Sequence, residues 1–464
     1  MDLLLAHAHF LSEDAEEQRI MRPYPPLGVL YISSHLKARG VDVEVFDGTF
    51  RSFADFERTL QRHRPLIVGV YVNMMTKRHA LRMIAMARTV NARVVVGGPD
   101  PAYYAAEYLD AGADVVVLGE GELTLEELVP VLRQRDVDEE QLTRVAGIVF
   151  RSRSGPLQRT PPRPLIANLS AQPYPDRHAI DINRYLRAWR DHHGYGPVSL
   201  ITARGCPYTC TWCSRSVFGT THRRRSVEDV VNEIAHIAER YRPDRLWYAD
   251  DVFGIHRQWT LDFARELRQS GLRFPFECIS RAERIDDAVA DAFVDMGCWR
   301  VWIGSESGSQ EVLDAMQRRV NVENVRSAAR RLKTRGIQVG LFIMLGFDGE
   351  RRDDLRATVE HLKQTGPDTF LTTVSYPIKG TPYYDRVADR IVAKQPWHQR
   401  TDRDLIIRER PTRRYYDFAR RWISGEVARH DHWQNRRYAQ ALRAASSALV
   451  GRIGMRVTEG LRES

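Results

Sequence analysis

The chain has 464 residues, enough for two to four domains at roughly 100–200 residues each. Hydrophobic residues make up 43% and charged residues 28%, as in ordinary globular proteins, and no apolar run approaches the ~18–20 residues of a membrane span. The formal net charge is +9, and almost all of the positive charge comes from arginine residues that are spread among sixty acidic residues. The sequence shows neither a basic stripe nor a nucleic-acid-binding motif. These features argue against an integral membrane segment and a nucleic-acid partner. The N-terminus does not resemble a signal peptide, so we expect a cytoplasmic protein.

Residues 1–150 alternate apolar runs with helical patterns. Strands are expected at Val41–Phe46, Leu66–Val72, Arg93–Val96 and Asp114–Leu118, and helices at Leu27–Ala38 and Lys77–Thr89. This alternation predicts a parallel, doubly wound α/β sheet of the Rossmann type, whose ligand would lie beyond the carboxyl ends of the strands. Glycines follow two of these strands and would let a bulky or phosphorylated ligand approach the backbone, although tight turns also use glycine.

A linker and a second alternating series follow. Residues 151–195 are rich in proline, arginine and polar residues and form the best linker candidate. In 196–385, six strand-like segments alternate with helical patterns, which predicts a partial parallel (β/α)6 barrel. The segments are Val198–Ala203, Arg245–Ala249, Phe274–Ile279, Trp299–Gly304, Val339–Leu345 and Thr369–Ser375. Residues 386–464 form a helical, arginine-rich C-terminal region.

Three of the five cysteines lie within eight residues, directly after the first strand of the second series: Cys206, Cys210 and Cys213. Catalytic groups of parallel barrels collect at this end of the strands. Three thiolates can hold three irons of a [4Fe–4S] cluster and leave the fourth iron open, whereas electron-relay clusters usually have four protein ligands. Structural zinc would need a fourth ligand, for which His222 is the nearest candidate. Cys278 and Cys298 are expected to be buried thiols.

The C-x3-C-x2-C spacing, with Trp212 before the third cysteine, resembles the radical S-adenosylmethionine (SAM) superfamily. The resemblance implies that the three cysteines hold a catalytic [4Fe–4S] cluster whose open iron chelates SAM. One electron from the reduced cluster would then cleave the sulfonium and release a 5′-deoxyadenosyl radical that abstracts a hydrogen atom.

Other segments of the second series resemble the SAM-binding motifs of that superfamily. Asp250 and Asp251 follow the second strand, where a carboxylate takes the methionine ammonium; the alternative is a helix N-cap. Arg281 follows the third strand and suits the methionine carboxylate, and Glu306 follows the fourth and suits the ribose. The predicted SAM contacts are therefore Tyr208, Trp212, Asp250, Asp251, Arg281, Glu306, Gly346 and Glu350. Asp348 stands where the family usually has proline, which puts the turn geometry in question.

The first domain resembles the cobalamin-binding domain that is fused to many radical SAM enzymes. The predicted cobalamin contacts are Leu27, Gly28, Asn73, Met74, Met75, Thr76, Gly97, Gly98, Pro99, Gly119, Glu120 and Gly121. The base-off signature Asp-x-His-x-x-Gly is absent, so the lower face of cobalt would carry water or no protein ligand, with Asn73, Met74 or Met75 close to it. The alternatives are a domain that has lost cobalamin or one that binds another nucleotide.

The resemblance covers most of residues 1–380, and the nearest subgroup includes the anaerobic magnesium-protoporphyrin ester cyclase and several methylases. It implies a methyltransferase acting on an unactivated carbon of a natural-product or lipid-like small molecule, with a flavodoxin- or ferredoxin-type electron donor. The alternative within the family is an oxidative cyclase or rearrangement enzyme without net methyl transfer. The alternative from another class is an electron-transfer or cobalamin-carrier protein.

Near the C-terminus, Leu442, Leu449, Ile453 and Val457 share one face of a predicted helix. We favour packing of this helix on the barrel with its arginines in solvent. Docking on a membrane surface is the alternative.

Overall fold

The computed structural model describes residues 1–463, which divide into two compact units. The first unit comprises Met1–Pro207, Ser214–Trp247 and Gln395–Thr401. The second unit comprises Tyr208–Cys213, Tyr248–Lys394 and the chain from Asp402 onward. The cysteine loop is therefore shared, because Cys206 belongs to the first unit and the other two cysteines to the second.

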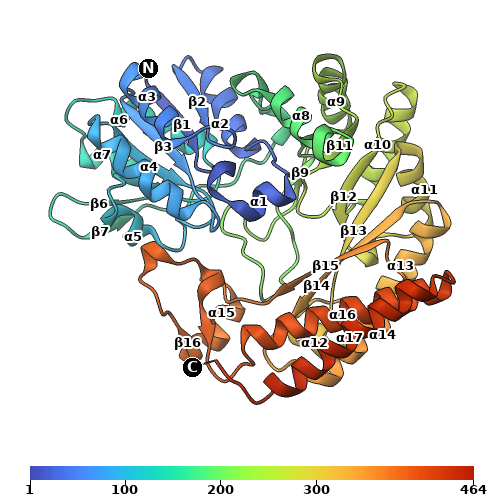
Figure 1. The fold of residues 1–464 in the computed structure, drawn as a ribbon. Coiled ribbons are helices and arrows are strands. Elements are labelled where there is room, and N and C mark those ends of the chain that lie inside the picture. The colour runs from blue at the N-terminus through green and yellow to red at the C-terminus, as the bar shows by residue number, and fades with distance from the viewer. Residues whose placement is uncertain (464) are drawn as a thin grey trace. The chain divides into compact units, whose positions relative to one another are not determined.

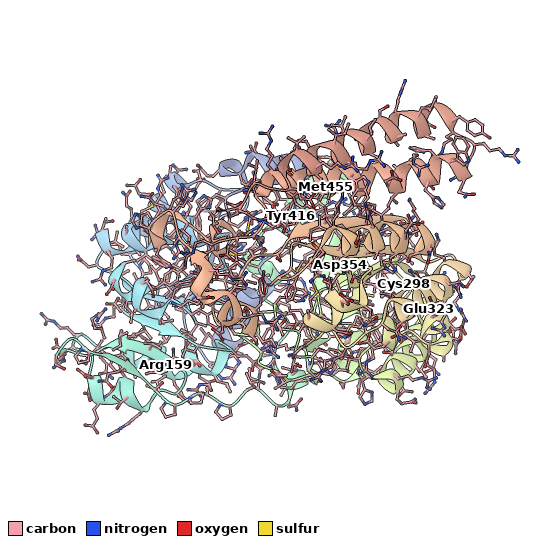
Figure 2. The ribbon with its side chains drawn as sticks, turned by 90° about the horizontal axis from the view of Figure 1, so that it is seen from below. Arg159, Cys298, Glu323, Asp354, Tyr416 and Met455 are labelled. Atoms are coloured by element: carbon pink, nitrogen blue, oxygen red, sulfur yellow. The ribbon has the colours of Figure 1, made fainter. Side chains whose placement is uncertain are left out.

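The first unit is built on a seven-stranded sheet in the order β2-β1-β3-β4-β5-β6-β7 (Figure 1). Its strands are β1 (Leu3–His7), β2 (Val43–Asp47), β3 (Ile67–Tyr71), β4 (Arg93–Gly97), β5 (Val115–Val117), β6 (Ile148–Arg151) and β7 (Leu157–Arg159). The first five are parallel, and β6 and β7 are antiparallel additions. The parallel strands are buried runs of Leu, Val and Ile, as expected for a sheet covered on both faces. The edge strand β7 is exposed, and its polar residues, including the Arg159 that Figure 2 labels, suit an open edge.

The sheet register brings four polar or small residues into one row at the carboxyl ends of neighbouring strands. His7 is opposite Asp47 on one side and Tyr71 on the other, and Tyr71 is opposite Gly97. A doubly wound sheet binds ligands at this edge. The row therefore fixes which side chains a ligand of the first unit meets.

The helices of the first unit include the two that the sequence predicts, at nearly the same bounds. They are α1 (Ala15–Ile20), α2 (Leu27–Lys37), α3 (Phe53–His63), α4 (Lys77–Thr89), α5 (Ala105–Asp110), α6 (Glu122–Leu132), α7 (Glu139–Arg144), α8 (Ile182–His193) and α9 (Val227–Tyr241). The expected linker at 151–195 contains β7 and α8 rather than irregular chain. Tyr185 and Trp189 of α8 are buried, and the Trp189 indole donates to the Pro23 carbonyl at 2.8 Å. The proline and arginine content conceals this amphipathic helix.

The second sheet has six strands in the order β15-β14-β13-β12-β11-β8, which is the sequential order expected of a partial barrel. The strands are β8 (Pro197–Leu200), β11 (Arg245–Tyr248), β12 (Phe276–Ser280), β13 (Cys298–Glu306), β14 (Gln338–Leu345) and β15 (Thr369–Val374). The four strands from β12 to β15 pair in parallel. The short strands β9 (Ala203–Arg204) and β10 (Arg223–Arg224) pair separately, directly before the cysteine loop and after it.

The second unit surrounds its strands with helices and ends in a helical hairpin. Its helices are α10 (Arg257–Gln269), α11 (Asp287–Met296), α12 (Gln310–Ala315), α13 (Val322–Thr334), α14 (Arg352–Thr365), α15 (Pro382–Val387), α16 (Arg413–Gln434) and α17 (Tyr438–Thr458). A small antiparallel pair, β16 (Ile391–Val392) and β17 (Ile406–Ile407), interrupts the helical C-terminal region. Cys278 and Cys298 are buried, as the sequence predicts.

Helices α16 and α17 lie side by side and contact through glycine (Figures 1 and 2). A Cβ atom on Gly451 would lie 2.5 Å from the Trp422 backbone nitrogen, and one on Gly454 would lie 2.3 Å from the Phe418 ring. The small-residue face of α17 therefore packs against α16. The expectation that the apolar face of α17 would be the packed one is wrong. The apolar residues stay exposed: Leu442, Leu449, Val450, Ile453 and Val457. Across residues 1–463, no helix combines the length and apolar character needed to cross a membrane.

Candidate cofactor sites

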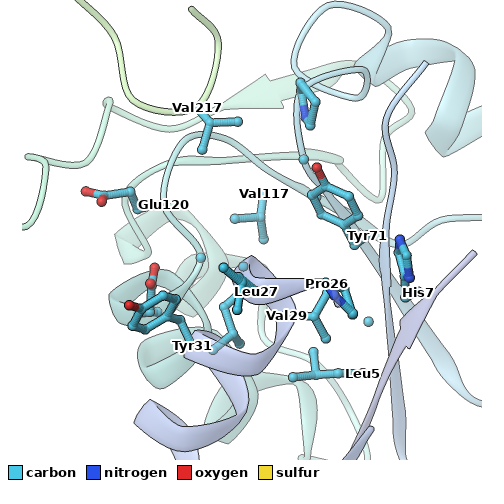
Figure 3. A pocket seen from close by; sticks show the side chains of 18 of the residues that line it. Leu5, His7, Pro26, Leu27, Val29, Tyr31, Tyr71, Val117, Glu120 and Val217 are labelled. Atoms are coloured by element: carbon cyan, nitrogen blue, oxygen red, sulfur yellow. The ribbon is translucent and has the colours of Figure 1, made fainter. Parts of the chain in front are cut away.

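A cavity of about 410 Å³ lies at the carboxyl edge of the first-unit sheet (Figure 3). The ends of β1, β3, β4 and β5 line it together with the first turns of α2. Most of the lining is aliphatic or aromatic, with a few polar groups, which is the usual character of a cofactor site. Nine of the twelve predicted cobalamin contacts line this first-unit cavity: Leu27, Gly28, Asn73, Gly97, Gly98, Pro99, Gly119, Glu120 and Gly121.

Glycine keeps the wall of the cavity at backbone level. Gly98 has a φ of +114°, and a Cβ there would lie 2.3 Å from the Val72 carbonyl oxygen. A Cβ on Gly121 would lie 2.7 Å from the Ile32 side chain, which also lines the cavity. A side chain at either position would clash with the protein itself, so only glycine lets the backbone follow this path along the cavity. The glycine cradle and apolar lining fit a large flat cofactor such as cobalamin.

Three predicted cobalamin contacts lie outside the lining of the cavity. Met75 is half exposed, Met74 is partly exposed and Thr76 is buried at the start of α4. Asn73 does line the cavity, but its carboxamide oxygen accepts hydrogen bonds from the Met75 and Thr76 backbone N–H groups at 2.9 and 3.0 Å. These four residues therefore form the turn that leads into α4, whose N-cap residue is Thr76, and the Asn73 carboxamide stabilises that turn.

A buried ionic network forms one wall of the cavity. Arg204 donates to Glu120 at 2.8 Å and to Glu122 at 2.7 Å, and Arg223 donates to Glu120 at 2.7 Å. The Ile166 backbone N–H also donates to Glu120, at 2.8 Å. Because Arg204 comes two residues before Cys206, the network fixes the chain entering the cysteine loop to the cavity wall. Sequence reasoning missed Arg204, whose partners are more than eighty residues away along the chain.

In the second unit, the chain from Tyr208 to Cys213 is held by its backbone. The Thr211 N–H donates to the Met316 carbonyl at 3.1 Å, and the Thr211 carbonyl accepts from the Tyr383 N–H at 2.9 Å. Cys210 is buried, and Arg281 Nη1 lies 3.7 Å from its sulfur. Burial raises the pKa of the Cys210 thiol, while the Arg281 guanidinium opposes the shift. Arg281 therefore lies where it favours the thiolate that a metal ligand requires.

The other groups on Arg281 already have partners. It donates to the Arg318 carbonyl at 2.5 Å and to Glu283, and its guanidinium stacks 3.7 Å from the centre of the Tyr208 ring. The predicted SAM contacts Tyr208 and Arg281 are thus brought together with Cys210. Because these protein groups accept from Arg281, few of its N–H donors remain for a substrate carboxylate.

Arg318 and Glu306 form a second buried pair beside Arg281. Arg318 Nε lies 3.8 Å from Glu306 Oε1, and its Nη2 donates to the Gly304 carbonyl at 2.7 Å. Arg318 Nε and Nη1 are buried without a hydrogen-bond partner among the described residues. The flanking residues Gln317 and Arg319 have φ values of 52° and 53°, a conformation that is uncommon outside glycine and is often found at functional sites. Sequence reasoning missed Arg318.

Two carboxyl groups of the second unit are close to neutral at physiological pH. Burial raises the pKa of Glu306 to about 8, against a weaker opposing effect of Arg281. Burial likewise raises the pKa of Glu350 to about 8, although the Gly346 backbone N–H donates to its carboxylate at 2.5 Å. Strongly shifted carboxyl groups are typical of functional sites.

The remaining predicted SAM contacts are not equally enclosed. Asp250 is buried and Asp251 is exposed. Trp212 packs beside a core cluster that includes Met316, and its Nε1 is buried without a partner among residues 1–463. A Cβ on Gly346 would lie 2.7 Å from the Tyr416 ring of α16, so a side chain of the C-terminal helices contacts this turn directly.

The departure from the usual family sequence at Asp348 has a local explanation. Arg390 donates to Asp348 at 2.7 Å. This ion pair ties the turn after β14 to the segment after α15, where the usual proline would stiffen the turn by itself.

Within residues 1–463, no three His, Cys, Asp or Glu side chains form a group that could hold a metal ion. The donor set nevertheless fits an iron–sulfur cluster, because three thiols occur in one anchored loop and a guanidinium lies beside one of them.

Comparison with known proteins identifies both domains. A family model for the Radical SAM superfamily matches residues 200–362, and one for the B12 binding domain matches residues 20–129. The chain is 28% identical over 406 residues to an uncharacterised methyltransferase of Pyrococcus horikoshii, covering 86% of each chain. It is 26% identical to the anaerobic magnesium-protoporphyrin IX monomethyl ester cyclase of Rubrivivax gelatinosus, covering 84% of this chain and 71% of the cyclase.

Solved structures support the fold. The radical SAM methyltransferase TsrM from Kitasatospora setae, with cobalamin and a [4Fe–4S] cluster bound, matches with a TM-score of 0.70 and 20% identity, covering 87% of this chain and 84% of TsrM. The fold is therefore that of a B12-binding domain followed by a radical SAM domain. The chain therefore carries a B12-binding domain and a radical SAM domain.

Proposed function

We propose that this chain is a cobalamin-dependent radical SAM methyltransferase that methylates an unactivated carbon of a natural-product or lipid-like small molecule. The observation that carries the proposal is that one chain combines a glycine-walled cavity in a B12-binding domain with a C-x3-C-x2-C loop in a radical SAM domain. The similarity to a methyltransferase over 86% of the chain supports the reaction type.

Cys206, Cys210 and Cys213 are the proposed ligands of a [4Fe–4S] cluster. When bound, the cluster and SAM supply a 5′-deoxyadenosyl radical through one-electron cleavage of the sulfonium. Arg281 favours the Cys210 thiolate and stacks on Tyr208. Thr211 anchors the loop through two backbone hydrogen bonds. These residues thus position Cys210 and the backbone of the loop next to it.

Arg318 is the proposed partner of the SAM carboxylate, in place of the Arg281 that the sequence motifs favour. Its two unpartnered N–H groups are buried, which is costly unless a ligand satisfies them, and guanidinium groups bind carboxylates well. Glu306 holds a proton near neutral pH because burial raises its pKa to about 8, so it can donate to or accept from a ribose hydroxyl. Asp250, the buried one of the two aspartates, is the proposed partner of the methionine ammonium.

The first-unit cavity is the proposed cobalamin site. When bound, cobalamin supplies the methyl group. The aliphatic lining excludes water, and the glycine wall lets a large ring lie against the backbone. The network of Arg204 with Glu120 fixes the chain that leads from this cavity to Cys206.

A second candidate function is oxidative cyclisation or rearrangement without net methyl transfer. The similarity to the anaerobic magnesium-protoporphyrin ester cyclase over 84% of the chain favours it specifically.

A cluster that must be reduced at low potential needs a reducing compartment. We therefore propose that the protein works in the cytoplasm with a flavodoxin- or ferredoxin-type donor.

The test is anaerobic reconstitution of the full chain with iron, sulfide and cobalamin, followed by dithionite and SAM. We expect release of 5′-deoxyadenosine and methionine, abolished in Cys210→Ala because one cluster ligand is lost. Cys298→Ala is the matched control, because this buried cysteine of the same unit lies outside the loop. A well-assembled cluster that releases no 5′-deoxyadenosine would contradict the radical chemistry, as would activity retained in Cys210→Ala.

Product analysis separates the two reactions when candidate substrates are supplied. Methyl transfer requires S-adenosylhomocysteine to form alongside 5′-deoxyadenosine. Substrate conversion with 5′-deoxyadenosine alone would favour the cyclase.

A further inference from the structure

His7 lies at the carboxyl end of β1, between β2 and β3 in the first-unit sheet, and lines the first-unit cavity (Figure 3). Its side chain is about nine-tenths buried, and its ring centre lies 6.0 Å from that of Tyr71. No motif in the sequence marks His7, because the base-off signature is absent. The sheet places it in the row of strand ends where a ligand of the unit binds.

Asp47 on the neighbouring strand orients the His7 ring. The Asp47 carboxylate lies 3.3 Å from His7 Nδ1. It also accepts the Tyr185 hydroxyl at 2.5 Å, the Thr49 hydroxyl at 2.8 Å and the Thr49 backbone N–H at 3.1 Å. A carboxylate held by these donors beside Nδ1 selects the tautomer that carries its proton there.

The other ring nitrogen of His7 is therefore the one with a lone pair. No described residue forms a hydrogen bond with Nε2, although the ring lines the cavity. The other polar groups of the wall are engaged elsewhere: Glu120, Glu122 and Arg204 with one another, and Asn73 with the start of α4. An imidazole that is oriented by a carboxylate and open at Nε2 is the usual form of a histidine that binds a metal.

We propose that His7 Nε2 is the protein ligand of cobalt in the first-unit cavity, with Asp47 and Tyr185 as positioning residues. The proposal rests on the proposed function, because it requires cobalamin in this cavity. It replaces the expectation that the lower face of cobalt carries water or no protein ligand, with Asn73, Met74 or Met75 close to it. Met74 and Met75 lie outside the lining, and the Asn73 carboxamide oxygen accepts from the turn before α4.

The experiment is electron paramagnetic resonance of the chain loaded with cob(II)alamin, produced with natural and with ¹⁵N-labelled histidine. An axial nitrogen splits the cobalt signal into triplets when it is ¹⁴N and into doublets when it is ¹⁵N. We expect triplets that become doublets in the labelled protein. Triplets that persist with labelled histidine would assign the nitrogen to the cofactor's own base, and an unsplit signal would leave cobalt without a nitrogen ligand. Either result overturns the proposal.

Variants identify which histidine is responsible. His7→Ala should lose the histidine-derived splitting and shift the cob(II)/cob(I) potential to more positive values, because an axial nitrogen disfavours the lower oxidation state. His9→Ala is the matched control, since its ring lies 5.9 Å from that of His7 and it does not line the cavity. Doublets retained in labelled His7→Ala would overturn the assignment to His7. The isotope result on the unaltered chain stands even if a variant folds poorly.

The two hypotheses fail differently. A chain that retains no cobalamin contradicts the proposed function. Cobalamin that is retained without a histidine nitrogen on cobalt contradicts only the assignment of His7.

Discussion

The two cofactor sites differ in how far the protein satisfies its own polar groups. In the first unit, both carboxylate oxygens of Glu120 accept hydrogen bonds from Arg204, Arg223 and the Ile166 backbone, and Arg223 Nη2 is the one atom of this network that is buried without a partner among residues 1–463. In the second unit, Arg318 Nε, Arg318 Nη1 and Trp212 Nε1 are buried without partners among residues 1–463. Buried polar groups are costly to leave unsatisfied. The comparison indicates that the first-unit cavity is formed before its cofactor arrives, whereas the SAM side is completed by its ligand.

Removal of Glu120 tests the preformed side and has the largest expected effect. Glu120→Ala leaves buried Arg204 without one of its two partners, so we expect the free energy of unfolding to fall by about 3–5 kcal/mol. Denaturant titration of the cobalamin-free chain measures it. Glu140→Ala is the control, because its pair with Arg144 is largely exposed and such pairs contribute little. Equal effects of the two substitutions would contradict a preformed ionic wall.

Arg318 tests the side that the ligand completes. Arg318→Met keeps much of the volume but removes the unpartnered donors. A hydrogen bond to a charged group contributes about 1.5–3 kcal/mol, so SAM should bind about 10- to 100-fold more weakly. Equilibrium dialysis with the reconstituted chain measures the affinity, and Arg330→Met, on the exposed face of α13, is the control. Unchanged SAM affinity in Arg318→Met would exclude Arg318 as the carboxylate partner.

The pH dependence of stability sharpens the same contrast. Glu306 has a pKa of about 8 in the folded chain against an ordinary value of 4.5, so between these values the folded state binds more protons than the unfolded state. Stability should therefore fall as pH rises through this window, by at most about 1.4 kcal/mol per pH unit for this group. Urea denaturation at pH 5.5 and 7.5 should show a smaller decline in Glu306→Gln. Parallel pH profiles would contradict the raised pKa.

Asn73 has the smallest expected effect and separates a role in the turn before α4 from cofactor contact. Asn73→Ala removes the hydrogen bonds to its carboxamide oxygen in that turn, which should cost about 1 kcal/mol, the usual net contribution of an intramolecular hydrogen bond. Thermal unfolding measures this cost, and cobalamin titration should give nearly the same affinity as the unaltered chain. Affinity lost without any loss of stability would instead make Asn73 a direct cofactor contact.

Regular alternation made much of the fold predictable from the sequence. The prediction Lys77–Thr89 matches α4 residue for residue, and the glycines after β4 and β5 lie at the cavity as expected. β1 was missed because a five-residue strand at the N-terminus has no preceding helix to complete the pattern. The hairpin of β6 and β7 was missed because antiparallel strands break the alternation that the prediction relied on.

Some site residues belong to local sequence motifs, whereas others are recognisable only from contacts that form in the folded chain. The cysteines and the cavity glycines occur at fixed spacings or after predicted strands, so the sequence exposes them. Arg204, Arg318 and His7 carry no local motif. Arg204 finds Glu120 over a separation of 84 residues and His7 finds Asp47 over 40, and only the folded register brings such partners together. Arg281 is predicted from the sequence to contact SAM, and the structure places it beside Cys210 and the Arg318 carbonyl.

Methyl transfer to the corrinoid tests the central claim without knowledge of the substrate. The full chain, reconstituted anaerobically with the cluster and cobalamin and then reduced, is incubated with SAM carrying a deuterated methyl group. If the chain is a cobalamin-dependent methyltransferase, the labelled methyl group should be recovered in the protein-bound corrinoid, with S-adenosylhomocysteine in equal amount. Reduced cobalamin that stays bound and unlabelled, while SAM is cleaved to 5′-deoxyadenosine, would contradict the account.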